Sequence, residues 1–227
     1  MQAQPRLLPV REPELPTGVV LVLHGGASRG QQMMVSPTQL SVVRMIPTAK
    51  RVAREGRGKL AVYRVLNSYR GWDTQHTPVA DVEWALGQVR ERHGELPVGL
   101  VGHSLGGRAA LLAGDQRGVE SVVALNPWVY PDDSVDLSGR RVLVVHGTAD
   151  RIALPQRAEL VARRIARTTE VGFIKIPGGK HAMLRRGRAF DGYAAEFTAV
   201  SLLGHVPRGS VSDPVMRVLD GEDWVTA

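Results

Sequence analysis

Short apolar runs alternate along the chain with longer stretches in which apolar residues recur at helical spacing. Four of the six apolar runs are rich in Val, Leu and Ile without clean polar alternation, which is typical of strands covered on both faces of a sheet. We expect strands at residues 18–26, 60–67, 96–104, 119–127, 140–148 and 171–179.

The amphipathic stretches between these runs predict helices. Pro78 suits a first helical position and Gly94 a stop, whereas Pro47 is expected to kink or break its helix. Strand–helix alternation throughout the chain favours an α/β fold, with a mostly parallel sheet of about six to seven strands and helices on both faces. We expect helices at residues 36–55, 77–94, 104–115, 154–168 and 182–204.

The chain of 227 residues, 43% of them hydrophobic, is long enough for one domain with a sizeable core. The alternating pattern spans residues 18–204, which we predict to be that domain. Residues 1–17 are expected to form an N-terminal extension or an edge strand, through the segment RLLPV. Residues 205–227 are expected to form an irregular or partly helical tail.

A serine lies among glycines in the stretch VGLVGHSLGGRAALLAG, where Gly102-His103-Ser104-Leu105-Gly106 fits the pattern G-x-S-x-G. The expected strand ends immediately before this pentapeptide and a helix begins immediately after it, which is the context of a nucleophile elbow. Glycines on both sides let the tight turn pass close to its neighbours. The hydroxyl of Ser104 would lie at a helix N-terminus, where backbone N–H groups favour a developing anion.

This strand–turn–helix with the sequence GHSLGG resembles the serine hydrolases of the α/β-hydrolase superfamily. That family places its residues in the order Ser, acid, His, with each partner just after a strand. In HGTADRIALP, Asp150 lies two residues past the expected strand end, similar to the family's H-G-x-x-D-x-x-V-P segment but with Leu154 where Val is usual. In IPGGKHAML, His181 lies in a glycine-rich loop before a helix. The resemblance covers about residues 18–204 and implies the α/β-hydrolase fold.

The resemblance implies that Ser104 is the nucleophile, that His181 is the base and then the acid, and that Asp150 orients and stabilises His181. Each residue also has a simpler interpretation. Ser104 would then fill a tight turn, His181 would be an ordinary loop histidine and Asp150 would cap a helix. Some members of the family carry the acid after the preceding strand, so three further carboxylates remain alternatives: Asp132, Asp133 and Asp136.

The first expected strand ends in HGGASRG. In the family, an H-G-containing loop at this place supplies one N–H of an oxyanion hole. The resemblance therefore implies the backbone of Gly26, with Ala27 as an alternative, together with the backbone of Leu105. Ala27 is also a candidate substrate-binding residue.

Residues 128–139, between the fourth and fifth expected strands, are too few for the helical lid that many α/β hydrolases insert there. We therefore expect no large lid and an open site. Trp128 and Tyr130 are predicted to lie near its rim and to bind substrate.

The histidines and carboxylates do not predict a metal site. His146 and Asp150 are four residues apart, but on a strand end and a loop rather than on one helix face, and there is no H-E-x-x-H pattern. His24 is expected to brace its loop, and the side chain of His103 to point away from the substrate. No cofactor is implied.

The formal charge of +7 does not by itself predict a nucleic-acid partner, because the arginines are scattered and no basic stretch is interleaved with aromatic residues. Docking to an anionic polymer or membrane would require the arginines to cluster on one face. The absence of cysteine excludes disulfides and is compatible with the cytoplasm, which we predict as the compartment. The start of the sequence lacks a signal-peptide pattern, and no apolar run approaches the ~20 residues of a membrane span.

The sequence thus predicts a serine hydrolase that cleaves small to medium carboxylic esters through an acyl-enzyme on Ser104. A thioesterase or an amidase would use the same residues, and a non-catalytic hydrolase-like binding protein is a further alternative. The small lidless plan resembles the carboxylesterase-like and dienelactone-hydrolase-like branches of the family. Dienelactone hydrolases carry a Cys nucleophile, so Ser104 argues against that chemistry. The oligomeric state is not predicted.

Overall fold

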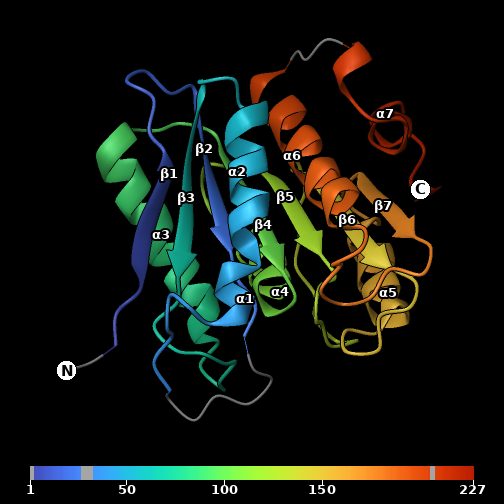
Figure 1. The fold of residues 1–227 in the computed structure, drawn as a ribbon, viewed down its shortest axis with the longest axis horizontal. Helices are drawn as coiled ribbons and strands as arrows, with labels where there is room; N and C mark the ends of the chain where they lie inside the picture. The colour runs from blue at the N-terminus through green and yellow to red at the C-terminus, as the bar shows by residue number, and fades with distance from the viewer. Residues whose placement is uncertain (1–2, 27–32, 205–207) are drawn as a thin grey trace.

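Eight strands form one sheet in the computed structural model, which describes residues 3–26, 33–204 and 208–227. The strand order is β1-β3-β2-β4-β5-β6-β7-β8 (Figure 1). β1 is antiparallel to β3, and every other neighbouring pair is parallel. The strands are β1 (Arg6–Arg11), β2 (Gly18–Leu23), β3 (Leu60–Leu66), β4 (Val98–His103), β5 (Val119–Leu125), β6 (Arg141–Gly147), β7 (Val171–Ile176) and β8 (Trp224–Thr226).

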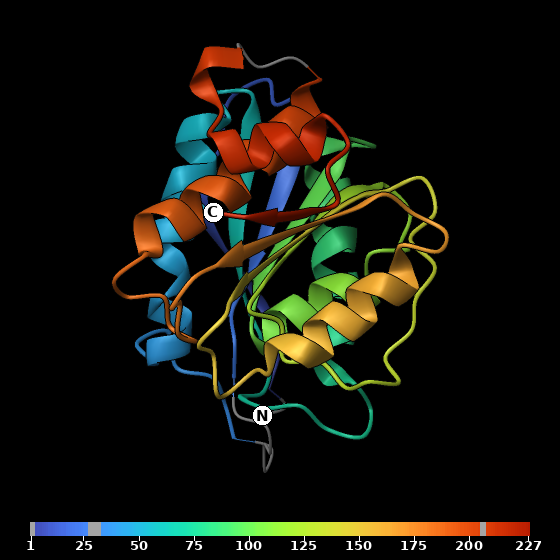
Figure 2. The same cartoon turned by 90° about the vertical axis from the view of Figure 1, so that its right-hand side faces the viewer.

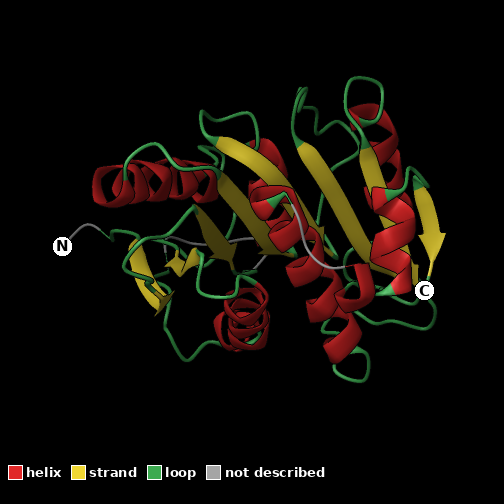
Figure 3. Ribbon diagram, turned by 90° about the horizontal axis from the view of Figure 1, so that it is seen from above, coloured by secondary structure: helices red, strands yellow, loops and turns green. Residues whose placement is uncertain are grey.

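Helices cover both faces of the sheet, as Figure 3 shows from above. Buried side chains of α3, α4 and α5 pack with one face, and those of α2, α6 and α7 with the other. The apolar runs of the strands are continuous because both faces of the sheet are buried. In β2, for example, Leu21 packs in the core on the side of α3, α4 and α5, and Val20 packs in the core on the side of α2, α6 and α7. The α/β-hydrolase fold predicted from the sequence is confirmed. The helices are α1 (Leu40–Val43), α2 (Met45–Glu55), α3 (Thr77–His93), α4 (Leu105–Leu112), α5 (Pro155–Ile165), α6 (Gly187–Leu203), the 3₁₀ turn η1 (Arg208–Ser210) and α7 (Asp213–Leu219).

The C-terminal segment contributes a strand that the sequence analysis did not anticipate. β8 runs parallel to β7 (Figure 2). Val225, at the centre of β8, is buried. α7 packs beside it, and a Cβ at Gly172 of β7 would collide with the side chain of Val218. Three residues are too few to show the alternation of apolar and polar positions by which a strand is predicted from sequence. Residues 224–226 are a strand because they pair with β7.

The helix expected at residues 36–55 is interrupted, as its proline suggested, but the break falls elsewhere. α1 and α2 meet at Arg44, and Pro47 lies within the first turn of α2. The first four N–H groups of a helix have no partner within the helix, so a proline there removes no hydrogen bond.

The carboxyl ends of the parallel strands meet at one edge of the sheet, where ligands bind in open α/β folds. Ser104 follows β4, Asp150 lies in the loop after β6, and His181 lies in the loop after β7. The connection from β5 to β6, residues 126–140, contains no helix or strand. No lid therefore covers this edge within the described chain.

Candidate active site

Ser104 occupies a strained turn between β4 and α4, with φ 58° and ψ −120°. The two flanking glycines are required by close backbone approach. A Cβ at Gly102 would collide with the carbonyl of Gly106, and a Cβ at Gly106 would lie 2.5 Å from two carbonyl oxygens at the end of β2. A positive φ strains the backbone of a residue other than glycine. Residues strained in this way occur preferentially at functional sites. The turn thus has the geometry that its sequence pattern predicted.

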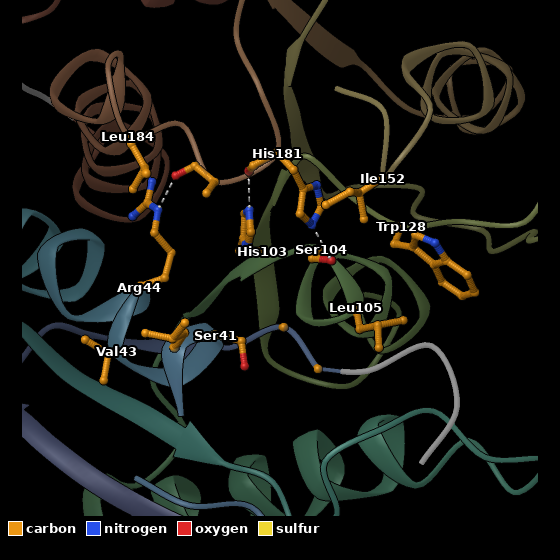
Figure 4. Close-up of a pocket in the computed structure, with 14 residues that line it drawn as sticks. Ser41, Val43, Arg44, His103, Ser104, Leu105, Trp128, Ile152, His181 and Leu184 are labelled. Carbon is orange, nitrogen blue, oxygen red and sulfur yellow. Dashed lines mark hydrogen bonds between the residues drawn. The ribbon is translucent and has the colours of Figure 1, made fainter. Parts of the chain in front are cut away.

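Three side chains from three loops form a hydrogen-bonded chain beside this turn (Figure 4). His181 Nε2 lies 3.0 Å from Ser104 Oγ, and His181 Nδ1 lies 2.7 Å from Asp150 Oδ2. The other oxygen of Asp150 accepts hydrogen bonds from the backbone N–H groups of Ile152 at 2.8 Å and Ala153 at 3.0 Å. Burial alone would raise the pKa of Asp150, but the contact with His181 and the two amides hold that pKa below its usual value. Asp150 is therefore ionised where it meets the imidazole.

The alternative carboxylates engage other partners. Asp133 forms a two-pronged ion pair with Arg108, at 2.7 and 2.8 Å, and Asp136 accepts hydrogen bonds from Ser138. Asp132 is exposed. In the described part of the chain none of the three is bonded to His181, so the structure brings Asp150, and not these residues, to the imidazole.

His24 and His146 are buried and bonded to backbone. His24 Nδ1 donates to the carbonyl of Gly25 at 2.5 Å, and its Nε2 accepts the N–H of Asn67 at 3.2 Å, so the ring joins the end of β2 to the loop after β3. His146 Nε2 donates to the carbonyl of Ala153 at 3.0 Å. Burial lowers the pKa of both rings, which keeps them neutral. Across residues 3–26, 33–204 and 208–227, no group of three or more His, Asp or Glu side chains is arranged to hold a metal ion.

His103 differs from the expectation that its side chain points away from the site. Its ring is buried, lies 4.9 Å from the ring of His181 between centroids, and forms part of the pocket wall. Its Nε2 donates to the carbonyl oxygen of His181 at 2.9 Å. Burial, followed by the nearby His181, lowers the pKa of His103 to about 3.

Ser104 opens into a cavity of about 770 Å³ whose wall includes Gly26 and Leu105. A Cβ at Gly26 would collide with the carbonyl of Arg70, so only glycine fits there. The two residues whose N–H groups were predicted to form an oxyanion hole therefore border the same space as the serine hydroxyl. Ala27 lies outside the described residues.

The two predicted rim aromatics differ in position. Trp128 lines the cavity, whereas Tyr130 is not part of its wall. The ring of Tyr130 packs edge-on against that of Trp128, with 4.9 Å between the ring centroids. The guanidinium carbon of Arg108 lies 4.6 Å from the centroid of the Tyr130 ring. Tyr130 therefore contacts a residue of the cavity wall without lining the cavity itself.

The sequence analysis missed the aliphatic wall of the cavity. It comes from α1, α4 and the loops after β6 and β7, which are brought together only by the tertiary fold. Two of the aliphatic residues in this wall are largely exposed to solvent, Leu184 with 86% of its surface accessible and Leu40 with 85%. The aliphatic residues that line the cavity are Leu40, Val43, Leu105, Ile152 and Leu184.

Comparison with known proteins agrees with this architecture. The model of the α/β hydrolase family matches residues 85–189, a range that contains Ser104, Asp150 and His181. The chain therefore has the α/β-hydrolase fold and resembles this family over those central residues. No curated protein matches it by sequence.

Solved structures that are similar in fold include a serine hydrolase without a lid and an arylesterase. XC6422 from Xanthomonas campestris, an α/β serine hydrolase without a lid, has a TM-score of 0.64 at 18% identity, covering 91% of this chain and 99% of its own. Est1E from Butyrivibrio proteoclasticus has a TM-score of 0.64 at 13% identity, covering 88% and 93%. An arylesterase has a TM-score of 0.63 at 16% identity, covering 87% and 84%.

Proposed function

We propose that the protein is a serine hydrolase that cleaves small to medium carboxylic esters through an acyl-enzyme on Ser104. The observation that carries the proposal is the continuous hydrogen-bonded chain from Asp150 through His181 to Ser104, at the wall of an apolar cavity. A nucleophile bonded to a base, with the base oriented by a third group, is the arrangement that activates a hydroxyl.

In the proposed reaction, Ser104 Oγ attacks the ester carbonyl carbon while His181 Nε2 takes the hydroxyl proton. The imidazolium then gives this proton to the leaving alcohol oxygen, which leaves an acyl-serine. Water, deprotonated by the same nitrogen, attacks the acyl-serine and releases the carboxylic acid. Asp150 holds the productive tautomer and stabilises the imidazolium in both halves.

The tetrahedral intermediates carry a negative oxygen, which we assign to the backbone N–H groups of Gly26 and Leu105. Leu105 is the first residue of α4, so the helix dipole favours this charge as well. One such donor is typically worth about 3–4 kcal/mol of transition-state stabilisation.

The cavity wall supports a small apolar acyl group rather than a polymer. Its aliphatic side chains offer no charge to a substrate, and Arg44, which also lines the cavity, is paired with Asp191 at 3.1 Å. No lid in the described part of the chain closes the mouth to small molecules in solution. Est1E has been solved with ferulic acid, an aromatic carboxylic acid, so aromatic acyl esters belong among the substrates to test. The proposed chemistry needs no cofactor, metal or nucleic acid. The proposed compartment is the cytoplasm, with which the cysteine-free sequence is compatible.

The test is turnover of matched butyryl substrates, the 4-nitrophenyl ester, a thioester and the 4-nitroanilide, by the wild type and Ser104→Ala. We expect fastest turnover of the ester, and a loss in Ser104→Ala of up to about 10⁶-fold in kcat. Preference for the thioester or the anilide would reassign the protein to a thioesterase or an amidase. Equal turnover by wild type and Ser104→Ala would contradict the proposal, and a folded protein that turns over none of them would favour a binding protein.

A further inference from the structure

The backbone carbonyl of His181 accepts hydrogen bonds from two buried side chains. His103 Nε2 donates at 2.9 Å and Asn126 Nδ2 donates at 2.8 Å. His181 lies in the segment 177–186, which contains no helix or strand. Regular secondary structure therefore does not fix this carbonyl, and the two side chains supply the contacts that do.

Asn126 links the loops on either side of the candidate site. It directly follows β5, is fully buried, and has φ 42°, a left-handed conformation that asparagine tolerates better than most residues. Its Oδ1 accepts the N–H of Gly147, at the end of β6, at 2.9 Å. Its Nδ2 donates to His181 and also to the carbonyl of Lys180, at 3.3 Å. One side chain thus ties the loop of the base to the strand that leads into the loop of Asp150.

His103 closes a ring around the nucleophile. Its backbone is bonded covalently to Ser104, its side chain holds the carbonyl of His181, and the imidazole of His181 returns to Ser104 Oγ (Figure 4). The separation between nucleophile and base is therefore fixed by a short cycle of covalent and hydrogen bonds.

We propose that His103 and Asn126 are positioning residues that hold the backbone of His181 so that its imidazole faces Ser104 on one side and Asp150 on the other. The proposal rests on the function proposed above and adds two residues to it. Asn126 is not among the residues that line the cavity, and His103, whose ring forms part of the cavity wall, is proposed to act through its bond to the His181 carbonyl. Each acts through His181.

The protonation state of His103 suits this role. A carbonyl oxygen only accepts, so the nitrogen that faces His181 must carry the proton. With a pKa of about 3 the ring stays neutral and carries a single proton, which leaves Nδ1 bare. Nδ1 is buried and has no hydrogen-bond partner among the described residues. Nε2 is therefore the nitrogen that carries the proton and donates to the His181 carbonyl.

The test compares two substitutions of His103. His103→Gln keeps an amide N–H that can reach the His181 carbonyl, and His103→Leu removes the donor. A misplaced catalytic group typically lowers the rate by about 100-fold. We expect His103→Leu to lower kcat by about 10–100-fold with KM changed less than about twofold, and His103→Gln to recover most of the loss.

Asn126→Asp provides a second, independent variant. It keeps an oxygen for the N–H of Gly147 but points another oxygen at the two carbonyls, so we expect a drop in kcat like that of His103→Leu. Thr198→Val is the matched control, because it removes a buried hydroxyl that donates to the Ala194 carbonyl within α6. This control is expected to lower the melting temperature without changing kcat.

The inference is overturned if folded His103→Leu keeps the wild-type kcat, or if kcat simply follows the melting temperature across the four variants. Failure of the proposed function is a separate outcome, seen as a wild type without turnover. In that case the downfield proton resonance of His181 Nδ1–H, bonded to Asp150, is the readout. It should weaken or shift in His103→Leu and stay in Thr198→Val, and an unchanged resonance in both would contradict the positioning role.

Discussion

The environment of Asp150 differs from that of a free side chain. Asp150 is buried, yet it accepts three hydrogen bonds at 2.7 to 3.0 Å. Asp150→Asn keeps the shape and the oxygen that faces the Ile152 and Ala153 amides. It replaces the oxygen that faces His181 by an NH₂ group, which favours the wrong imidazole tautomer. We expect a loss of about 10⁴-fold in kcat, measured on the butyrate ester.

The control for this substitution is Asp136→Asn, at an exposed carboxylate bonded to Ser138, which should leave kcat unchanged. If Asp150→Asn stays within about tenfold of the wild type, the orienting acid has been misassigned.

The buried histidines predict how stability depends on pH. Burial lowers the pKa of His24, His103 and His146 in the folded state, whereas in the unfolded chain each titrates near ~6.5. Their contribution to stability is therefore complete above about pH 6.5, and falls as the unfolded state takes up protons at lower pH. For His103 the loss continues to about pH 3.

We expect the free energy of unfolding to fall between pH 6.5 and 4, with His103→Gln removing up to about 1.4 kcal/mol per pH unit from the slope. Urea denaturation at several pH values measures this. A slope that is the same in His103→Gln would show that His103 is charged in the folded protein.

The sequence could predict the residues whose chemistry is tied to a motif, and not those that act through tertiary contact. Ser104, Asp150 and His181 each follow a strand in a recognisable segment, and the fold brings them together. Asn126 carries no motif, because its role depends on two loops that lie far from it in sequence. The place of Tyr130 near the rim stays a prediction, because its ring contacts Trp128 and Arg108 but does not itself line the cavity.

Among the elements, the turn between β4 and α4 leaves no room for added side-chain atoms at its glycines. Gly106→Ala would bring a Cβ to 2.5 Å from backbone carbonyls of β2, which cannot move without shifting the sheet. Overpacking typically costs about 1–3 kcal/mol, and we expect Gly106→Ala to reach the upper end of that range and to abolish turnover. Urea denaturation and the ester assay measure the two effects.

Gly87→Ala, within α3, is the matched control, since a Cβ there meets nothing within 4 Å. It should stabilise the protein by about 0.5–1 kcal/mol, because alanine favours helix over glycine. Equal effects of the two substitutions would contradict the packing described for the turn.

Long elements could be predicted from their apolar periodicity, and short ones could not. The six central strands and α3 were expected close to their observed positions. β8 was missed, because its three residues owe their conformation to β7, and because the stacking of Trp224 on Phe173, 4.8 Å between ring centres, is a tertiary contact.

In the molecule as a whole, the open apolar cavity should set substrate preference. Burying one methylene is worth about 0.8 kcal/mol, which is about fourfold in rate constant. We therefore expect kcat/KM for 4-nitrophenyl esters to rise about fourfold per added methylene until the wall formed by Leu40, Ile152 and Leu184 is covered. A value that falls steadily from acetate onward would show that the acyl chain does not enter this cavity.

No helix within the described residues is long and apolar enough to cross a membrane. The site also lacks a covering segment in the described chain, so catalysis should need no lipid surface to open it. We expect turnover of short esters to rise hyperbolically with concentration, without a jump at the critical micelle concentration. Such a jump would mean that a surface reorganises the site.

The central claim is that Ser104 is activated by His181 and Asp150, and labelling with a fluorophosphonate probe tests it most directly. Mass spectrometry of the digested protein should find the phosphonate on the peptide that contains Ser104, and no label in Ser104→Ala. His181→Ala should label far more slowly, because the proton of Ser104 then has no acceptor. A folded wild-type protein that stays unlabelled, or that is labelled at another residue, would contradict the account.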